Sequence, residues 1–147
     1  MERVGEYQRE ALQHVRVADH MLTMTYPLVK DPKLLVAVLE NLFLATTSAM
    51  AALLYKERYY KRIPPFHDTF ESKFSSFKMH IAPKKKIEAK WLRFVATLKE
   101  AVNDHKNATT EFPRKEKYVM ADEHYKMRTI SETELKKHLK NTKSFVY

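Results

Sequence analysis

Residues 31–62 read DPKLLVAVLENLFLATTSAMAALLYKERYYKR, and the rest of the chain is expected to pack around them. Asp31 and Pro32 are typical of a helix N-cap and a first helical residue, where the N–H that proline lacks has no partner anyway. No glycine or proline interrupts residues 34–60, and the two prolines that follow cannot continue a helix. The pattern predicts a helix of roughly 30 residues, about 45 Å long. Apolar side chains cover more than half of its circumference, which predicts a central helix buried on several sides.

The segment before this stretch predicts a second long helix over residues 2–25. Tyr26-Pro27 is expected to end or kink it, because the residue before a proline avoids the α region. A short link then returns the chain, which predicts an antiparallel pair of helices. Apolar residues at every third or fourth position give the expected buried face, which consists of Val4, Tyr7, Ala11, Val15, Ala18 and Leu22.

Two further helices are predicted after the central stretch. Asp68 or Thr69 is a candidate N-cap for the first, and Pro83 is expected to stop it. The second is expected to run out around residues 103–107. The buried face of the first is predicted to consist of Phe70, Phe74, Phe77 and Ile81. That of the second is predicted to consist of Ile87, Trp91, Phe94 or Val95, Leu98 and Val102.

The C-terminal part predicts a small β-hairpin and a last helix. Residues 107–117 are polar, which indicates a loop, whereas the composition of residues 118–129 favours a hairpin. A lone hairpin is marginally stable in water, so we expect it to pack on the helices. Ser131 and Glu134 match the S-x-x-E capping box that opens a helix. The sequence therefore predicts a mainly α fold, a single helical-bundle domain over residues 1–147 with about five helices and a hairpin before the last one.

Composition excludes several functional classes. The chain has no cysteine and one glycine, which excludes disulfides, cysteine-ligated zinc and the Gly-rich loops that cradle phosphates. No histidine pair at i, i+4 has a carboxylate partner that would define a metal site, so neither a metal nor a cofactor is predicted. The missing cysteines and the lack of a secretory signal pattern are typical of a cytoplasmic protein. Glu40 and other polar residues in the central stretch favour a soluble bundle over a membrane span.

The positive charge indicates a polyanionic partner, since the formal net charge is +9. Residues 56–62, with the sequence KERYYKR, mix cations with tyrosines, which suits single-stranded RNA as well as a solvated face. Tyr118 and Tyr125 lie near another basic run, where they can stack on bases or simply pack the hairpin onto the bundle. The candidate nucleic-acid-binding residues are Lys84, Lys85, Lys86, Lys90, Arg93, Arg114, Lys115 and Lys117.

Several helical motifs together point to a family resemblance. The first helix reads A-x-x-x-V-x-x-A-x-x-x-L from Ala11 to Leu22, and the central one carries an alanine-rich apolar run over residues 42–54. A short terminal helix with a capping signal follows residue 130. This pattern resembles the HEPN-type helical bundles of prokaryotes. Residues 112–119 (FPRKEKYV) are similar to a segment of uncharacterised archaeal proteins.

The resemblance also raises the question of catalysis. HEPN ribonucleases carry an Arg-x(4–6)-His motif in a late helix. Their chemistry needs no metal, because the histidine moves a proton at the ribose 2′-hydroxyl while the arginine stabilises phosphate charge. In this chain the spacing occurs at Arg9…His14 and Arg62…His67, both outside the expected late helix. His105, at the predicted end of the fourth helix, is the other candidate proton carrier.

Three functions remain open on the sequence. The leading prediction is a non-enzymatic, basic, cytoplasmic protein that associates with RNA or a ribonucleoprotein. The first alternative is a HEPN-type ribonuclease or a toxin/antitoxin-related nucleotidyl-transfer partner, with His105, His67 and Arg62 as candidate catalytic residues. The second is a structural module that forms a homodimer. Its expected contact is the stripe of partly small residues Lys33, Ala37, Glu40, Leu44, Thr47 and Ala51.

Overall fold

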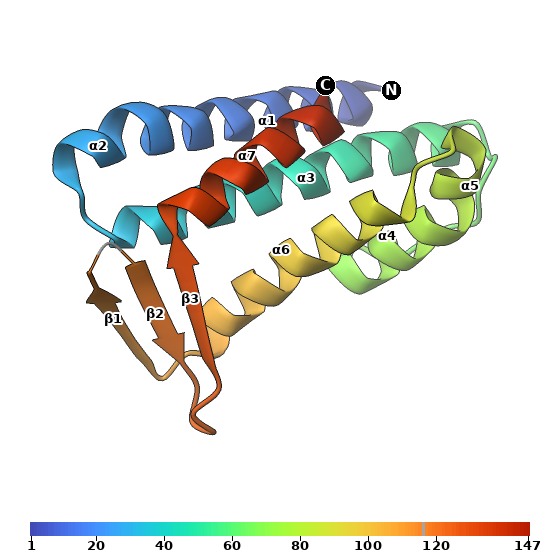
Figure 1. Ribbon diagram of the computed structural model, residues 1–147. Helices are drawn as coiled ribbons and strands as arrows, with labels where there is room; N and C mark the ends of the chain where they lie inside the picture. Colours follow the sequence, from blue (N-terminus) through green and yellow to red (C-terminus); the bar gives the residue numbers. More distant parts are fainter. Residues whose placement is uncertain (116) are drawn as a thin grey trace.

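Helix α3 (Lys33–Tyr59) runs through the middle of the molecule, and the other long helices lie along it (Figure 1). These are α1 (Glu2–His20), α6 (Ala89–Asn107) and α7 (Glu132–Val146). The computed structural model describes residues 1–115 and 117–147. The predicted central helix is confirmed, because its residues are buried on several sides, among them Leu35, Val36, Val38 and Ala51.

The central helix is shorter than residues 31–62 at both ends. Pro32 is the residue directly before the helix, in the place expected for Asp31. Asp31 still caps from one position further out, because its Oδ1 accepts a hydrogen bond from the backbone N–H of Lys33 at 3.0 Å. At the other end the helix finishes at Tyr59, and Lys61 takes a left-handed φ of 55° that cannot continue it.

By length and composition alone, α3 is apolar enough to cross a membrane. More than half of its most apolar stretch is buried inside the protein, where α1, α6 and α7 contact it. The core helix of a soluble protein passes the same test. In this fold α3 is the core helix of a soluble domain.

The first helix continues beyond residue 25 without a break. It passes through a π-helical turn, η1 (Met21–Thr25), into a last α-turn, α2 (Tyr26–Val29), which begins with Tyr26-Pro27. A proline ring collides with the carbonyl four residues back, and a wider π turn makes room for it. The segment ends at Lys30, which has a φ of 52° and donates its N–H to the Tyr26 carbonyl at 2.7 Å.

The third helical segment repeats this arrangement. It consists of α4 (Phe70–Ser76), the π turn η2 (Phe77–Ile81) and α5 (Ala82–Lys85). Thr69 is its N-cap as predicted, since Oγ1 accepts a hydrogen bond from the Ser72 N–H at 3.1 Å. The prediction that Pro83 stops this helix is wrong, because η2 accommodates the proline and the helix continues to the left-handed Lys86.

The last helix begins where the capping box predicts. Ser131 Oγ accepts a hydrogen bond from the Glu134 N–H at 3.3 Å, and α7 follows. Together with α6, the described residues form five continuous helical segments. This confirms the predicted mainly α fold.

The predicted β-hairpin is part of a three-stranded antiparallel sheet with the order β1-β2-β3. Strands β2 (Lys117–Ala121) and β3 (Met127–Ser131) form the hairpin. The prediction of a loop over residues 107–117 is wrong in part, because β1 (Thr110–Arg114) pairs with β2. As an edge strand, β1 tolerates Pro113, and its mostly exposed side chains give no alternating pattern.

The two tyrosines of the hairpin have different places. Tyr118 in β2 is buried and belongs to the main core. Tyr125, within the predicted hairpin, lies in the β2–β3 turn, with a φ of 62° and 88% exposure. Asp122 closes that turn, since its Oδ1 accepts hydrogen bonds from the N–H groups of His124 and Lys126, each at 2.9 Å.

The buried residues form two clusters along α3. The larger one joins α1, α3, α6 and α7 to the sheet, which contributes Tyr118, Met120 and Ile130. The smaller one lies toward the C-terminal end of α3, where Met50 and Leu54 meet Phe77 of η2. The sheet therefore closes one end of the helical core, and the α4–α5 segment closes the other (Figure 1).

Leu42 and Leu44 test the central position of α3. Leu42 is fully buried, whereas Leu44 on the same helix is 44% exposed. We expect Leu42→Ala to lower the free energy of unfolding by about 2–5 kcal/mol, because deletion of buried methyl groups leaves a cavity. Leu44→Ala should lower it by less than about 1 kcal/mol. Urea denaturation measures both, and equal losses would contradict this placement of the helix.

Candidate functional site

The predicted basic residues lie at opposite ends of the molecule (Figure 1). The cluster over residues 84–93 lies where α3 finishes and α5 leads into α6. Arg114 ends β1 and Lys117 begins β2, near the start of α3. The 27 residues of α3 span about 40 Å between these ends. The fold therefore does not combine the two clusters into one surface.

The third basic run, residues 56–62, lies beside the first cluster. Lys84 Nζ of α5 lies 4.0 Å from Glu57 Oε2 at the end of α3, so the two elements are neighbours. We call this joint surface the basic end. It comprises Lys56, Arg58, Lys61, Arg62, Lys84, Lys85, Lys86, Lys90 and Arg93.

Carboxylates neutralise only part of the basic end. Glu57 is buried, and its Oε2 lies 2.7 Å from Arg62 Nε as well as facing Lys84. Lys90 Nζ lies 3.8 Å from Glu88 Oε2. The other six cations are exposed and make no ion pair with any residue that the structure describes; they are Lys56, Arg58, Lys61, Lys85, Lys86 and Arg93.

Two exposed tyrosines accompany these cations. Tyr59 and Tyr60, at the end of α3, are 60% and 51% exposed, and their rings meet edge to face with centroids 5.1 Å apart. The guanidinium of Arg62 lies 4.8 Å from the ring centre of Tyr60. Aromatic faces beside cations are the arrangement with which proteins stack bases and neutralise phosphates of single strands.

The basic residues at the sheet end lack this arrangement. Arg114, Lys115 and Lys117 are exposed around the β1–β2 turn. Tyr118 follows them but is buried, and Tyr125 lies in the turn at the other end of β2. Of the two alternatives for Tyr118, packing of the hairpin onto the bundle is therefore the one that the structure shows, while Phe112 of β1 is 38% exposed.

His105, near the end of α6, lies between two glutamates. Its Nδ1 is 2.6 Å from Glu111 Oε1 of β1, close but not aligned as a hydrogen bond, and its Nε2 is 3.5 Å from Glu40 Oε1 of α3. Two carboxylates on either side of the ring repel an RNA phosphate. Among the described residues, no group of three or more His, Asp or Glu side chains is placed to hold a metal ion. The contacts of His105 with Glu40 and Glu111 instead connect α3, α6 and the sheet.

Tyr118 extends the same contact network. Its O–H donates a hydrogen bond to Glu111 Oε2 at 2.6 Å. Burial raises the pKa of Tyr118 to about 12, and the hydrogen bond to Glu111 and the charge of that carboxylate act in the same direction. The pair holds β1 to β2 beside the end of α6.

The raised pKa of Tyr118 predicts how stability depends on high pH. The pKa of Tyr118 in the folded protein lies above the ordinary 10.0, so the protonated hydroxyl stabilises the fold. This stabilisation is complete below pH 10 and is lost as the pH rises through about 12. Tyr118→Phe lacks the titrating hydroxyl, so over this range it should lose less of its own free energy of unfolding than the parent protein. Urea denaturation of both proteins below pH 10 and near pH 12 measures the difference. Parallel losses would contradict the assignment.

The two Arg-to-His spacings do not form joint sites. Arg62 is held by Glu57, and His67 is exposed, with its backbone N–H donating to Ser72 Oγ at 2.8 Å. His14 of the other spacing has its Nδ1 3.0 Å from Asn41 Oδ1, which joins α1 to α3. Arg62 and His14 therefore have partners outside their own spacing.

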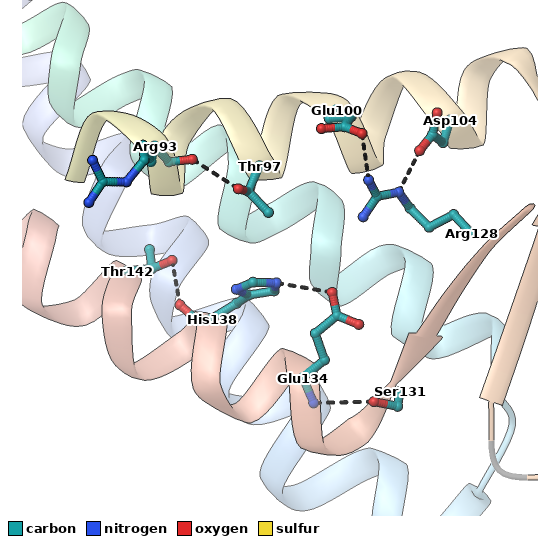
Figure 2. Close-up of polar contacts among 9 residues, drawn as sticks. All are labelled: Arg93, Thr97, Glu100, Asp104, Arg128, Ser131, Glu134, His138 and Thr142. Atoms are coloured by element: carbon teal, nitrogen blue, oxygen red, sulfur yellow. Dashed lines mark hydrogen bonds and ion pairs between the residues drawn. The ribbon is translucent and has the colours of Figure 1, made fainter. Parts of the chain in front are cut away.

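Figure 2 shows a polar network between α6 and the β3–α7 segment that the sequence analysis missed. Arg128 of β3 places its Nη2 3.1 Å from Glu100 Oε1 and donates from Nε to Asp104. Glu100 and Asp104 are one turn apart, so both carboxylates face the same side of α6. That acidic pair was the only signal in the sequence for a shared cationic partner.

A second group of polar contacts in Figure 2 lies within α7 and includes Glu134 and His138. His138 Nε2 lies 3.3 Å from Glu134 Oε1, and its ring packs 5.7 Å from the ring of Phe94. The hydrogen bond to His138 lowers the pKa of Glu134 below its ordinary 4.5, and the charge of Arg128 adds to the effect. The ionised Glu134 carboxylate therefore stabilises the fold above pH 4.5, and this stabilisation is lost as the pH falls through the lowered pKa of Glu134 in the folded protein.

Arg128 should matter more to stability than an exposed lysine in an ion pair. Arg128→Met should lower the free energy of unfolding by about 1–3 kcal/mol, because Glu100 and Asp104 lose their shared partner. The matched control is Lys136→Met, which removes an exposed contact of 3.0 Å to Glu132 on α7 and should cost less than about 1 kcal/mol. Urea denaturation at neutral pH measures the free energy of unfolding of both variants. Equal losses would show that the Arg128 contacts stabilise the protein no more than an exposed ion pair does.

The stripe expected to form a homodimer is partly used within the chain. Glu40 contacts His105, and Ala51 is buried. Leu44 is the member with a large exposed apolar side chain. The stripe is therefore not a continuous exposed face, and the homodimer stays a prediction.

Comparisons with known proteins add no relative to this description. No protein-family model, curated protein or solved structure matches the chain. The HEPN-like resemblance therefore stays a prediction.

Proposed function

We propose that this chain is a cytoplasmic, non-enzymatic protein that binds single-stranded RNA through the basic end. One observation carries the proposal. Six cations without an ion-pair partner among the described residues share one end of the molecule with two exposed tyrosines. At the sheet end, by contrast, Tyr118 beside the cations is buried, and Phe112 of β1 is 38% exposed, against 60% and 51% for Tyr59 and Tyr60.

The electrostatic part of the proposal follows from what lies near each cation. A cation that already has a carboxylate partner gains little from a phosphate, whereas an unpaired one releases the phosphate's counterions when it binds. Lys85, Lys86 and Arg93 belong to the second kind and lie within one short stretch of α5 and α6. Affinity should therefore depend steeply on salt.

The aromatic part favours single strands over duplexes. Bases in a duplex are stacked on one another, and protein side chains reach mainly its backbone. Tyr59 and Tyr60 lie at the end of a helix and are more than half exposed; because Arg62 already lies over the Tyr60 ring, Tyr59 offers the ring on which an unstacked base can lie. Single-stranded RNA uses both features of the basic end, and a duplex uses only the charge.

Fluorescence anisotropy with a labelled single-stranded RNA tests the proposal. Affinity should fall between about 50 and 200 mM salt, and the double variant Lys85→Gln/Lys86→Gln should reduce the slope of log K against log salt by about 1.4, or ~0.7 per lost phosphate contact. Tyr59→Ala should weaken binding about fivefold or more at constant salt, because one stacking contact is lost.

The matched control is Lys115→Gln/Lys117→Gln, which removes the same charge at the opposite end of the molecule. Equal losses from the two double variants, or a salt-independent affinity, would contradict binding at the basic end. Gel analysis of the RNA after incubation addresses the ribonuclease alternative in the same samples.

A further inference from the structure

An open cavity of about 670 Å³ lies beside the basic end. Its walls come from α1, α3, the turn between α5 and α6, and the end of α7. The volume lies within the range of small-molecule sites, about 300–1,000 Å³. Tyr59 and Tyr60, the tyrosines proposed to stack bases, do not line this space.

The cavity is lined mainly by apolar side chains. Alanines at positions 11, 49 and 52 of α1 and α3 leave the space open, because their side chains end at Cβ. Leu12, Leu53 and Ile87 supply aliphatic surface. Trp91 and Phe145 form an aromatic wall, with ring centroids 6.4 Å apart. Such a surface takes the apolar part of a ligand and offers few groups that could read a nucleobase.

The polar side of the cavity is positively charged. Lys85 and Lys86 line it and have no ion-pair partner among the described residues. Glu88 also lines it, but Lys90 lies 3.8 Å from its carboxylate and balances that charge. Two free ammonium groups beside an apolar wall are complementary to a ligand with one anionic end.

We propose that this cavity binds an amphipathic anion, a carboxylate or phosphate carried on an apolar chain. The chain would lie against Leu53, Trp91 and Phe145, with the anionic group at Lys85 and Lys86. The site is distinct from RNA binding, although the two share these lysines. It depends on the alanine-lined space, whereas the RNA contacts depend on the exposed tyrosines.

Trp91 is the chain's only tryptophan, so its fluorescence reports on the cavity directly. The probes are dodecanoate and dodecyl phosphate, compared with dodecanol and dodecylamine, all below the concentrations at which they form micelles. We expect both anions to change the emission saturably with one site per chain. The amine should bind at least about tenfold more weakly, because a charge-assisted contact is replaced by repulsion. The stronger of the two anions identifies the headgroup.

Two variants make the test specific. Ala49→Phe fills the cavity and should abolish the fluorescence change, whereas Leu44→Phe, on the same helix but outside the cavity, should leave it intact. Lys85→Gln/Lys86→Gln should remove the preference for the anions over dodecanol while dodecanol still binds. Thermal unfolding checks that each variant is folded. If Ala49→Phe is unstable, the headgroup preference of Lys85→Gln/Lys86→Gln still tests the proposal.

Three outcomes would overturn the proposal: binding that does not saturate, equal affinity for dodecanoate and dodecylamine, or unchanged dodecanoate binding by folded Ala49→Phe. RNA titration of the same variants separates the two proposals. Ala49→Phe should bind RNA like the parent protein, and Tyr59→Ala should bind dodecanoate like the parent protein. Failure of either proposal therefore leaves the other measurable.

Discussion

The need to bury one long apolar helix organises the whole structure. The buried residues of α3 lie on several of its sides, as Leu35, Val38 and Ala51 show, so no single neighbour can cover them. Helices α1, α6 and α7 each contact α3, and the sheet closes one end through Tyr118, Met120 and Ile130. Within the described residues no lysine or arginine is buried, so the chain's positive charge lies in the outer layer. Glu57 is the one buried carboxylate among them, and its partners Arg62 and Lys84 come from the surface.

A chain with one glycine has to reverse direction by other means. Two helices do so with the same device: a π turn, a proline, and a left-handed lysine three residues after it. Pro27 leads to Lys30 in this way, and Pro83 leads to Lys86. A left-handed φ costs an ordinary residue about 1–2 kcal/mol, which the surrounding packing has to offset. Because Lys61 and Lys86 occupy such positions, the turns that end α3 and α5 also place two of the free cations of the basic end.

The spacing of apolar residues, together with the capping and turn residues, was enough to predict the central helix, the Thr69 and Ser131 caps and the hairpin. Each of these features depends on residues that are neighbours in the sequence. Strand β1 escaped prediction because an exposed edge strand has no alternating pattern. The extra turn after Pro83 escaped because a proline is read as a stop unless a π turn is foreseen. The candidate site divided in the same way. The basic runs were visible, but only the fold reveals that residues 56–62 adjoin Lys84, whereas Arg114 lies toward the other end of α3, a helix about 40 Å long.

The charged residues at the two ends of the molecule differ in whether they are paired within the chain. At the sheet end, Arg128 pairs with Glu100 and Asp104, and His105 lies between Glu40 and Glu111, so these charges hold the sheet onto the helices. At the basic end, Glu57 and Glu88 engage three cations and leave six without a partner among the described residues. Unpaired cations repel one another and gain no stability from ion pairs, so their position together, beside exposed tyrosines and an open apolar cavity, favours the proposed ligands over a purely structural role. The net charge of the chain does not distinguish these two roles. They are distinguished by whether a carboxylate lies within ion-pair distance of each cation, and the fold determines which carboxylates do.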